Sequence, residues 1–335
     1  MDSHFSADYP EWGSAPRGPL VRLDRAHQGE WMGSVIGKDP VTGEPMVYQL
    51  LRCELCILLH LWPLPSEEAL RTFYAREFYQ TAHPDYLARY EADRAWWALC
   101  MHGPLLNSLR DASQDLSGSP RILDVGAGPG LLLDEARRRG WTTEALEPSL
   151  PCATRLRARG HRVLDGSLLD IPKETYDCLT MWEVLEHVPN PEETLLDVWN
   201  VLQPGGVLGL VVPNEWTPGQ LEACRRFGVS RWWIAAPEHL NYFTPKTLQL
   251  VARRAGFQQV TMRSTYPMVE QFLLTEGRCY VGNDSLGRAC HQERMAREMA
   301  QMRAGQWATM ETEYIANVAM RRGRELVYVG RKPLA

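Results

Sequence analysis

The chain has 335 residues, of which 44% are hydrophobic and 23% charged, and its formal net charge is −5. This length suffices for one large domain with additions or for two modest domains, and the composition is that of a soluble globular protein. Because proteins that wrap nucleic acid need an excess of basic residues to neutralise phosphates, the acidic balance argues against nucleic acid as a partner.

The first elements predicted along the chain form a flexible tail over residues 1–20 and an N-terminal extension over 21–118. The tail is rich in Pro, Gly and Ser and lacks the apolar core of a signal peptide. Ser66 is expected to cap the first helix of the extension, because early acidic residues follow it. In chain order, the extension is expected to hold β-like runs within 20–62, helices at 65–80 and 86–109, and a linker at 111–120.

Residues 119–335 are expected to form an α/β domain with a doubly wound parallel sheet, because strand and helix patterns alternate through it. A mostly helical insertion is expected over 268–323, between the last two strands. The predicted strands are 121–125, 142–146, 161–164, 176–182, 207–213, 257–264 and 324–333. The predicted helices are 131–139, 149–159, 191–202 and 245–255.

A glycine loop follows the first strand of this domain and predicts a cofactor site. Gly126, Gly128 and Gly130 permit a tight turn and close approach of the backbone to a ligand. The nicotinamide fingerprint G-x-G-x-x-G would place its third glycine at Leu131, which disfavours a dehydrogenase. Glu147 ends the next strand, where a carboxylate can accept two hydrogen bonds from a ribose diol.

Six motifs in one order resemble the class I S-adenosylmethionine-dependent methyltransferases, most closely the branch of the ubiquinone-biosynthesis O-methyltransferases. The resemblance covers roughly residues 120–257, and the terminal strand "RELVYVGRKP" fits it too. It implies a Rossmann-like sheet of seven strands with the last one antiparallel, and S-adenosylmethionine as the methyl donor. The motifs are "LDVGAGPG", "EALEPS", "DGSLLDIP", "YDCLTMWEVLEHVPNP", "VLQPGGVLGLVVPN" and "HLNYFTPKTLQLVARRAGF".

The same resemblance assigns donor-binding roles along the ends of the strands. Asp124 and the loop 126–130 would line the methionine part of the donor, and Glu147 would hold the ribose hydroxyls. Ser167 and Leu168 would contact the adenine. The complete set of expected donor-binding residues is Asp124, Gly126, Ala127, Gly128, Gly130, Glu147, Pro148, Ser167, Leu168, Trp182 and Glu183.

The acceptor's proton must be removed by a base or with the help of a metal, and "EVLEH" offers candidates for both. Glu183, Glu186 and His187 are spaced i, i+3, i+4 and would share one face of a helix. With His239 they could bind Mg²⁺ or another divalent ion, as in some relatives with an E-x-x-E-H pattern. The alternative is that Glu186 and His187 only tie the loop to the sheet. A metal is therefore expected to be possible but not favoured.

His239 is expected either to act alone as the general base or to cap the helix that follows it. It lies at the end of the aromatic insertion 215–240, in the region where the family builds its substrate cover. The candidate catalytic residues are therefore His239, His187 and Glu183. Four aromatic side chains are expected to wall an apolar acceptor pocket: Trp232, Trp233, Tyr242 and Phe243.

Cys53 and Cys56 resemble half of a zinc ribbon that precedes a "P-x-P-S" helix in some relatives. A closed tetrahedral site needs four ligands, and upstream only His27 lies nearby, so zinc is not favoured and a ribbon-like remnant held by apolar packing is predicted. Tyr74, Phe78 and Tyr79 fall near helical spacing and form either a lid over the donor or a plain core stripe.

These features predict an enzyme that methylates a small organic metabolite at oxygen, in secondary or natural-product metabolism, with a homodimer as a possible assembly. A peptide or protein side chain as acceptor and a non-catalytic donor-binding protein remain alternatives. The scattered cysteines suit a reducing compartment, and no apolar run approaches the roughly 20 residues of a membrane span. We therefore expect a cytoplasmic protein without a membrane anchor.

Overall fold

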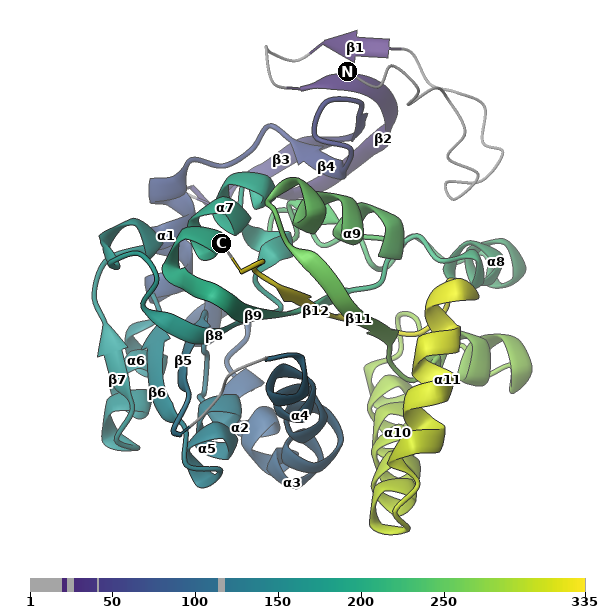
Figure 1. The fold of residues 1–335 in the computed structure, drawn as a ribbon. Helices are drawn as coiled ribbons and strands as arrows, with labels where there is room; N and C mark the ends of the chain where they lie inside the picture. Colours follow the sequence, from purple (N-terminus) through teal and green to yellow (C-terminus); the bar gives the residue numbers. More distant parts are fainter. Residues whose placement is uncertain (1–19, 23–26, 41, 114–117, 335) are drawn as a thin grey trace.

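The structure is a computed structural model that describes residues 20–22, 27–40, 42–113 and 118–334. Most of the tail predicted for 1–20 and the centre of the predicted linker therefore lie outside the described residues. Two sheets organise the remainder, a five-stranded N-terminal sheet and a seven-stranded sheet that carries the glycine loop (Figure 1). Among the described residues, no helix has the length and apolar character needed to cross a membrane.

The larger sheet has the strand order β11-β12-β9-β8-β5-β6-β7. β12 runs antiparallel to both of its neighbours, and the other strand pairs of this sheet are parallel. The predicted Rossmann-like sheet with an antiparallel last strand is therefore confirmed. β9 begins before the predicted strand 207–213, because its first residue, Leu202, pairs with Tyr176 of β8 ahead of a shift in register. The strands are β5 (Arg121–Val125), β6 (Thr142–Leu146), β7 (Arg162–Leu164), β8 (Tyr176–Trp182), β9 (Leu202–Pro213), β11 (Gln258–Ser264) and β12 (Glu325–Arg331).

Helices cover both faces of this sheet, which explains why its strands are apolar on both sides. In β5, Ile122 belongs to the hydrophobic cluster beneath α4 and α5, whereas the next residue, Leu123, belongs to the cluster beneath α7 and α9. Both side chains are completely buried. The helices that cover the sheet are α4 (Gly103–Ala112), α5 (Leu131–Arg138), α6 (Leu150–Ala158), α7 (Pro191–Val201) and α9 (Pro245–Arg254).

The N-terminal extension shares its sheet with the methyltransferase-like part of the chain. Its strand order is β1-β2-β3-β4-β10, and β10 (Asn241–Tyr242) comes from the segment after His239. The extension is therefore joined to the second part by main-chain hydrogen bonds as well as by side-chain packing. The strands it contributes are β1 (Leu20–Arg22), β2 (Gln28–Lys38), β3 (Pro45–Cys53) and β4 (Leu59–Trp62).

The helices of the extension begin with α1 (Glu67–Arg76), where the predicted cap is confirmed because the Ser66 side chain accepts a hydrogen bond from the Ala69 N–H. The single helix predicted for 86–109 is wrong, because Asp93 leaves the helical conformation with φ −93° and ψ 9°. Four shorter segments replace it. They are α2 (Tyr86–Ala92), α3 (Arg94–Trp96), η3 (Trp97–His102) and α4. A further segment, η2 (Phe78–Ala82), lies between α1 and α2.

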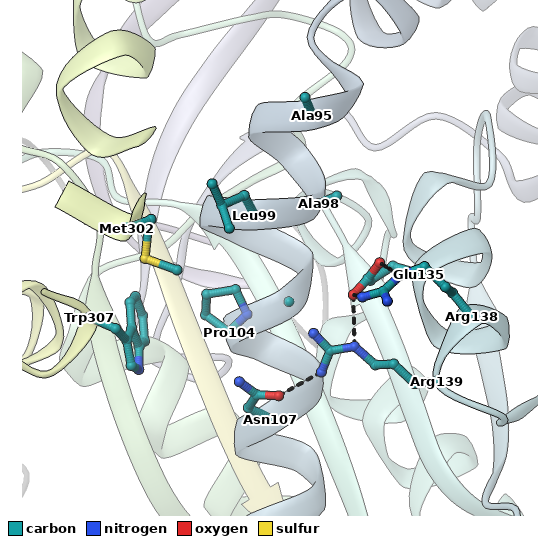
Figure 2. A pocket seen from close by; sticks show the side chains of 11 residues that line it. Ala95, Ala98, Leu99, Pro104, Asn107, Glu135, Arg138, Arg139, Met302 and Trp307 are labelled. Atoms are coloured by element: carbon teal, nitrogen blue, oxygen red, sulfur yellow. Dashed lines mark hydrogen bonds and ion pairs between the residues drawn. The ribbon is translucent and has the colours of Figure 1, made fainter. Parts of the chain in front are cut away.

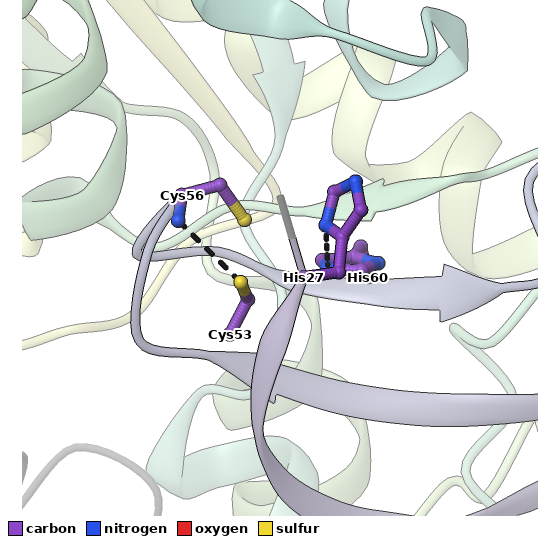
Figure 3. A group of neighbouring side chains, drawn as sticks. All are labelled: His27, Cys53, Cys56 and His60. Carbon is purple, nitrogen blue, oxygen red and sulfur yellow. Dashed lines mark hydrogen bonds between the residues drawn. The ribbon is translucent and has the colours of Figure 1, made fainter. Parts of the chain in front are cut away.

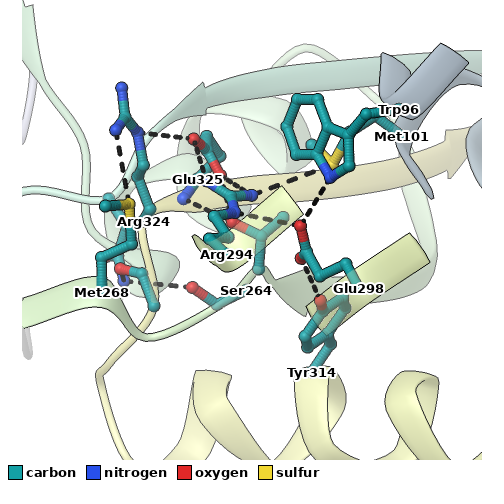
Figure 4. Close-up of polar contacts among 12 residues, drawn as sticks. Trp96, Met101, Ser264, Met268, Arg294, Glu298, Tyr314, Arg324 and Glu325 are labelled. Atoms are coloured by element: carbon teal, nitrogen blue, oxygen red, sulfur yellow. Dashed lines mark hydrogen bonds and ion pairs between the residues drawn. The ribbon is translucent and has the colours of Figure 1, made fainter. Parts of the chain in front are cut away.

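Between β11 and β12 the chain forms the expected helical insertion, with η6 (Val269–Thr275), α10 (Asp284–Arg303) and α11 (Trp307–Ala319). Figure 4 shows how a buried arginine attaches it to the sheet. Arg294 of α10 donates to Glu298 at 3.1 Å and to Glu325 of β12 at 3.2 and 3.3 Å. The Trp96 indole also donates to Glu298, at 2.8 Å. The insertion is thus fixed to β12 and to the N-terminal helices by one ionic network.

Candidate active site

The expected donor-binding residues gather at the carboxyl ends of neighbouring parallel strands. β5 pairs with β6 on one side and with β8 on the other. Asp124 is the penultimate residue of β5, Glu147 follows β6, and Trp182 ends β8. Open α/β sheets bind ligands in the crevice outside the carboxyl ends of their strands, so this edge is the place for a cofactor.

The glycine loop has the backbone conformation that its sequence requires. Gly126, Gly128 and Gly130 all have positive φ angles, of 69°, 51° and 81°. A Cβ atom on Gly126 would lie 2.6 Å from Cγ2 of Val184, so a larger residue would also clash there. The loop therefore lets a ligand approach the main chain closely at the carboxyl end of β5.

Glu147 holds this loop and is also placed to bind a ligand. Its two carboxylate oxygens accept hydrogen bonds from the Gly128 N–H at 2.6 Å and the Ser149 N–H at 2.7 Å. Burial raises the pKa of Glu147 to about 7, and these two hydrogen bonds oppose the rise. A buried carboxylate with spare lone pairs gains from further donors, which a ribose diol would supply.

Asp124 is buried behind the loop with 2% of its surface exposed. The Thr180 hydroxyl of β8 donates to its Oδ1 at 2.7 Å, and burial raises the pKa of Asp124 to about 7. Sequence reasoning missed Thr180. The sequence signal that could have identified it is a polar residue two positions before the end of β8, the strand that neighbours β5.

The other expected donor contacts lie along the same edge of the sheet. Ala127 packs against the cluster beneath α5, and Trp182 contacts the His102 ring at 4.9 Å. Pro148 and Ser167 are exposed, and Leu168 is half-buried. Ser167 caps the short helix η4 (Leu168–Asp170) after β7, and its hydroxyl donates to Asp170 at 2.9 Å. The loop after β7 thus presents its backbone where the adenine is expected.

An aromatic row from the extension covers the glycine loop. A Cβ atom on Gly128 would lie 3.1 Å from the Tyr79 hydroxyl, so this tyrosine lies directly against the loop. Tyr79 contacts Tyr86, which stacks on Tyr90, which stacks on Trp97. Burial and the nearby Glu147 charge raise the pKa of Tyr79 far above its ordinary value. The position of Tyr79 favours a lid, and that role stays a prediction.

Two histidines and two carboxylates meet beyond the ends of β8 and β9. The rings of His187 and His239 lie 5.0 Å apart and edge to face. His187 donates from Nδ1 to the Glu238 carbonyl at 2.7 Å, which leaves its Nε2 as an acceptor. His239 Nδ1 contacts Glu215 Oε1 at 3.2 Å. Ligand atoms of Glu186, His187 and His239 all lie within 4.8 Å of one another.

The two histidines have opposite electrostatic surroundings. Burial, together with the neighbouring His239, lowers the pKa of His187 to about 3. Burial also disfavours charge on His239, but its hydrogen bond to Glu215 and the charges of Glu215 and Glu186 raise its pKa to about 9. At neutral pH, His187 is neutral and His239 is an imidazolium paired with a buried carboxylate.

Sequence reasoning missed Glu215, whose signal is an acidic residue two positions after the predicted strand 207–213.

Glu183 occupies a different place from the one expected. The segment Leu185–His187 is a single 3-10 turn, η5, and Glu183 precedes it with φ 51°. The expectation of one helical face through Glu183, Glu186 and His187 is therefore wrong. Glu183 does not belong to the group of potential ligand atoms formed by Glu186 and the two histidines.

The expected aromatic pocket wall is largely buried core. Tyr242 and Phe243 are completely buried and Trp233 is 6% exposed. These side chains pack in hydrophobic clusters between the two sheets, where they fix the segment that carries His239. Trp232, the fourth expected wall residue, is half-buried, so at least three of the four are not available to an acceptor in this conformation.

A hollow of about 420 Å³ lies elsewhere, between α4, α5 and the insertion (Figure 2). Among its lining residues, Glu135 accepts from the Arg139 guanidinium at 2.8 Å, and Arg139 also donates to Asn107 at 2.6 Å. None of the predicted site residues lines it. Its polar side chains already pair with one another, so we place the functional site at the glycine loop and the histidine pair instead.

Replacing Glu147 tests the donor site. We expect Glu147→Ala to weaken S-adenosylmethionine binding about 10- to 100-fold, because hydrogen bonds to a charged group contribute about 1.5–3 kcal/mol. Isothermal titration calorimetry measures this loss. The matched control is Glu193→Ala, an exposed glutamate at the start of α7, which should bind the donor like wild type. Equal affinities for all three proteins would contradict the assignment of Glu147.

Comparison with known proteins agrees with this geometry. Residues 98–262 match a family model described as a methyltransferase domain. The ubiquinone biosynthesis O-methyltransferase of Xanthomonas oryzae pv. oryzae (strain PXO99A) is 36% identical over 139 residues, which cover 37% of this chain and 58% of that protein. The chain therefore spans somewhat less than three fifths of the length of this relative.

A longer match is the ubiquinone biosynthesis O-methyltransferase of Dinoroseobacter shibae (strain DSM 16493 / NCIMB 14021 / DFL 12). It is 28% identical over 229 residues, covering 59% of this chain and 92% of that protein. A solved S-adenosylmethionine dependent methyltransferase from Mesorhizobium loti aligns with a TM-score of 0.41 and 18% identity, over 68% of this chain and 96% of that one.

The sheet and the family match define the class of protein. Together they support a class I S-adenosylmethionine-dependent methyltransferase, a class in which S-adenosylmethionine is the methyl donor. Within that class it is similar to proteins named ubiquinone biosynthesis O-methyltransferase.

Proposed function

We propose that this chain transfers a methyl group from S-adenosylmethionine to an oxygen atom of a small organic metabolite, with His239 as the base. The observation that carries the proposal is the pairing of half-buried His239 with buried Glu215, beside a neutral His187 and beyond the carboxyl ends of the strands. A base that a carboxylate orients and strengthens is the arrangement that removes a proton from a hydroxyl.

Methyl transfer is an in-line displacement at a carbon that the sulfonium already activates, so the protein mainly aligns donor and acceptor and excludes water. The glycine loop and Glu147 would bind the donor, and the tyrosines over the loop would exclude water. The acceptor oxygen attacks the methyl carbon as the carbon–sulfur bond breaks. The proton of the acceptor passes to Nε2 of His239, whose Nδ1 is held by Glu215.

His187 suits an orienting role better than that of the base. Its Nδ1 is engaged by a backbone carbonyl, and its pKa of about 3 makes it too weak a base to take a proton from a hydroxyl. Its Nε2 lies 3.8 Å from Glu186 Oε1. We infer that His187 accepts a hydrogen bond from the acceptor.

Metal assistance is a second way to remove the same proton, and one observation favours it. Glu186 is completely buried, and neither of its carboxylate oxygens has a hydrogen-bond partner among the described residues. Glu186, His187 and His239 would hold a divalent ion, which would lower the pKa of an acceptor hydroxyl bound to it. Full activity in EDTA would leave His239 as the base, whereas loss of activity restored by Mg²⁺ would favour the metal.

Replacing Glu215 tests the base. We expect Glu215→Gln to lower the pKa of His239 by about one to two units, because it removes a hydrogen-bonded opposite charge. A general base works in its neutral form, so the rate of wild type should rise with pH through a midpoint near 9, and the variant's rise should occur at lower pH. NMR titration of the imidazole and the pH–rate profile measure both effects.

The control for this experiment is Glu222→Gln, an exposed glutamate on α8 (Pro218–Phe227) that pairs with Arg225 on the surface. Its profile should coincide with that of wild type. A Glu215→Gln profile that also coincides with wild type would contradict the role of the His239–Glu215 pair.

A small metabolite as acceptor is supported by the names of the relatives and by the acidic charge balance. Natural-product metabolism and a cytoplasmic location belong to the same proposal, and no disulfide joins any of the eight cysteines, as suits a reducing compartment. The exposed helical insertion would dock a second copy of the chain or, under the alternative proposal, a peptide substrate.

The acceptor is identified with deuterium-labelled donor. Wild type and His239→Asn are incubated with fractionated metabolite extract and labelled S-adenosylmethionine, and labelled products are found by mass spectrometry. We expect a labelled small molecule from wild type only. Label that appears exclusively on polypeptide would favour the peptide alternative. Donor binding without any labelled product would favour a non-catalytic donor-binding protein.

A further inference from the structure

We propose that the N-terminal sheet binds one zinc ion through four side chains, His27, Cys53, Cys56 and His60. We call this group the Cys–His cluster (Figure 3). Its four potential ligand atoms, two sulfurs and two imidazole nitrogens, all lie within 4.8 Å of one another. The proposal concerns a site apart from the donor and the histidine pair, and it does not depend on the proposed function.

The strand register brings these four residues together from three segments. Cys53 ends β3, Cys56 lies in the turn after it, and His60 is on β4. The Glu54 N–H donates to the Gln28 carbonyl at 2.8 Å, which holds the residue before it, His27, next to this turn. The pairing of the three strands therefore fixes the cluster, and no movement of the chain is needed to assemble it.

The distances suit a tetrahedral zinc site. With Zn–N bonds of about 2.0–2.1 Å, two nitrogen ligands of a tetrahedral ion lie about 3.3 Å apart. His27 Nδ1 and His60 Nε2 are separated by 3.1 Å. The two cysteine sulfurs lie within 4.8 Å of these nitrogens and of each other. All four groups thus converge on one point, as ligands of a single ion must.

Groups around the cluster prepare these side chains as ligands. The His60 Nδ1–H donates to the Leu61 carbonyl at 3.0 Å, which leaves the lone pair of Nε2 directed at the cluster. The Cys56 N–H donates to the Cys53 sulfur at 3.4 Å, which orients this sulfur in the turn. Ligating histidines commonly donate their second ring N–H to a carbonyl, and this bond fixes both the tautomer and the ring orientation.

Charge and burial select zinc among the common ions. Cys53 and His60 are 3% and 1% exposed, so a net charge here would be costly. Two thiolates and two neutral imidazoles around Zn²⁺ sum to zero charge. Magnesium and calcium prefer oxygen ligands, whereas a tetrahedral set of two sulfurs and two nitrogens is typical of zinc.

The cluster is tied to the segment that carries His239. His60 lies opposite Asn241 in the pairing of β4 with β10. The Leu61 N–H donates to the Leu240 carbonyl at 2.9 Å, and the Leu240 N–H donates to the Glu186 carbonyl at 2.8 Å. A zinc ion that fixes β4 would therefore also stiffen the main chain beside the histidine pair, so its role would be structural.

Metal analysis of the full chain tests the proposal without any activity assay. The protein is purified under reducing conditions without chelators, and its zinc is measured by inductively coupled plasma mass spectrometry. We expect about one zinc per chain for wild type and for Cys224→Ser, a half-buried cysteine on α8, and a loss of at least fivefold in Cys56→Ser and in His27→Gln. His187→Gln should keep its zinc, which separates this site from the histidine pair.

A second measurement uses unmodified protein, in case the variants fail to fold. Apoprotein titrated with Co²⁺ should develop thiolate-to-cobalt charge transfer and the intense visible bands of a tetrahedral ion, and Zn²⁺ should abolish both. Alkylation should spare Cys53 and Cys56 until a chelator is added. The proposal would be overturned by wild type that holds no zinc and shows no cobalt bands, by a Cys53–Cys56 disulfide under reducing conditions, or by zinc that is lost only in His187→Gln.

Discussion

His239→Asn is expected to lower kcat by about 10² to 10⁴, the usual contribution of a positioned general base. Asparagine keeps a polar side chain near Glu215 but cannot take a proton at any accessible pH. Because His239 belongs to the histidine pair and not to the glycine loop, the affinity for S-adenosylmethionine should change little. The measurement is the turnover number at saturating donor and acceptor.

The control for this prediction is the folded state of the same variant. Removing His239 leaves Glu215 buried without its ionic partner, so thermal unfolding and calorimetry with the donor must accompany the kinetics. A variant that folds, binds the donor like wild type and loses turnover supports the base. A variant that turns over at close to the wild-type rate would exclude His239 from the chemistry.

Arg294→Met is expected to destabilise the protein by about 3–5 kcal/mol, the usual cost of removing one partner from a buried ion pair. Arg294 is completely buried between Glu298 and Glu325, which are 1% and 6% exposed. Its loss leaves two buried carboxylates without their shared cation and removes a guanidinium that lies 5.1 Å from the centre of the Trp96 ring. Urea unfolding measures the change.

Arg297→Met is the matched control on the same helix. Its side chain is 40% exposed and pairs with Glu276 and Glu293 at the surface, where such pairs contribute about 1 kcal/mol or less. Equal destabilisation by both substitutions would contradict a special role for the buried network. So would an Arg294→Met variant that unfolds at the same urea concentration as wild type.

The acid stability of wild type should depend on the same network. Burial would raise the pKa of Glu325, but the Arg294 charge lowers it to about 2. The pKa of Glu325 is lower in the folded chain than in the unfolded chain, where it is about 4.3. Its charged form therefore stabilises the fold above about pH 4.3, and this contribution is lost as the pH falls towards 2. Arg294→Met should therefore lose less stability than wild type between pH 5 and 2.

The sheet could be predicted from the sequence because its central strands are buried on both faces and are bounded by glycine or by a capped helix. "RILDV" before the glycine loop and "TPKTLQLVARRAG" with Thr244 as its cap both have the expected structure. The helix expected over 86–109 was wrong because its pattern does not reveal the break at Asp93. Periodicity reports which face is buried, and it is insensitive to a local change of helix type.

The acidic partner of His239 and the second histidine of the Cys–His cluster could not be predicted in the same way. Glu215 and His239 are 24 residues apart and meet only because α8 and its loops fold back over the sheet. His60 stands in the apolar run "ILLHLW", where the pattern indicates a buried strand and nothing marks a ligand. Its partners become visible only when the register of β2, β3 and β4 is known.

Calorimetric titration of the purified chain with S-adenosylmethionine and, separately, with NAD tests the central claim most directly. The glycine loop, Asp124 and Glu147 predict saturable binding of S-adenosylmethionine at micromolar concentration, with Glu147→Ala clearly weaker and NAD without effect. No heat of binding with S-adenosylmethionine at high micromolar concentration, or binding of NAD in its place, would contradict the account.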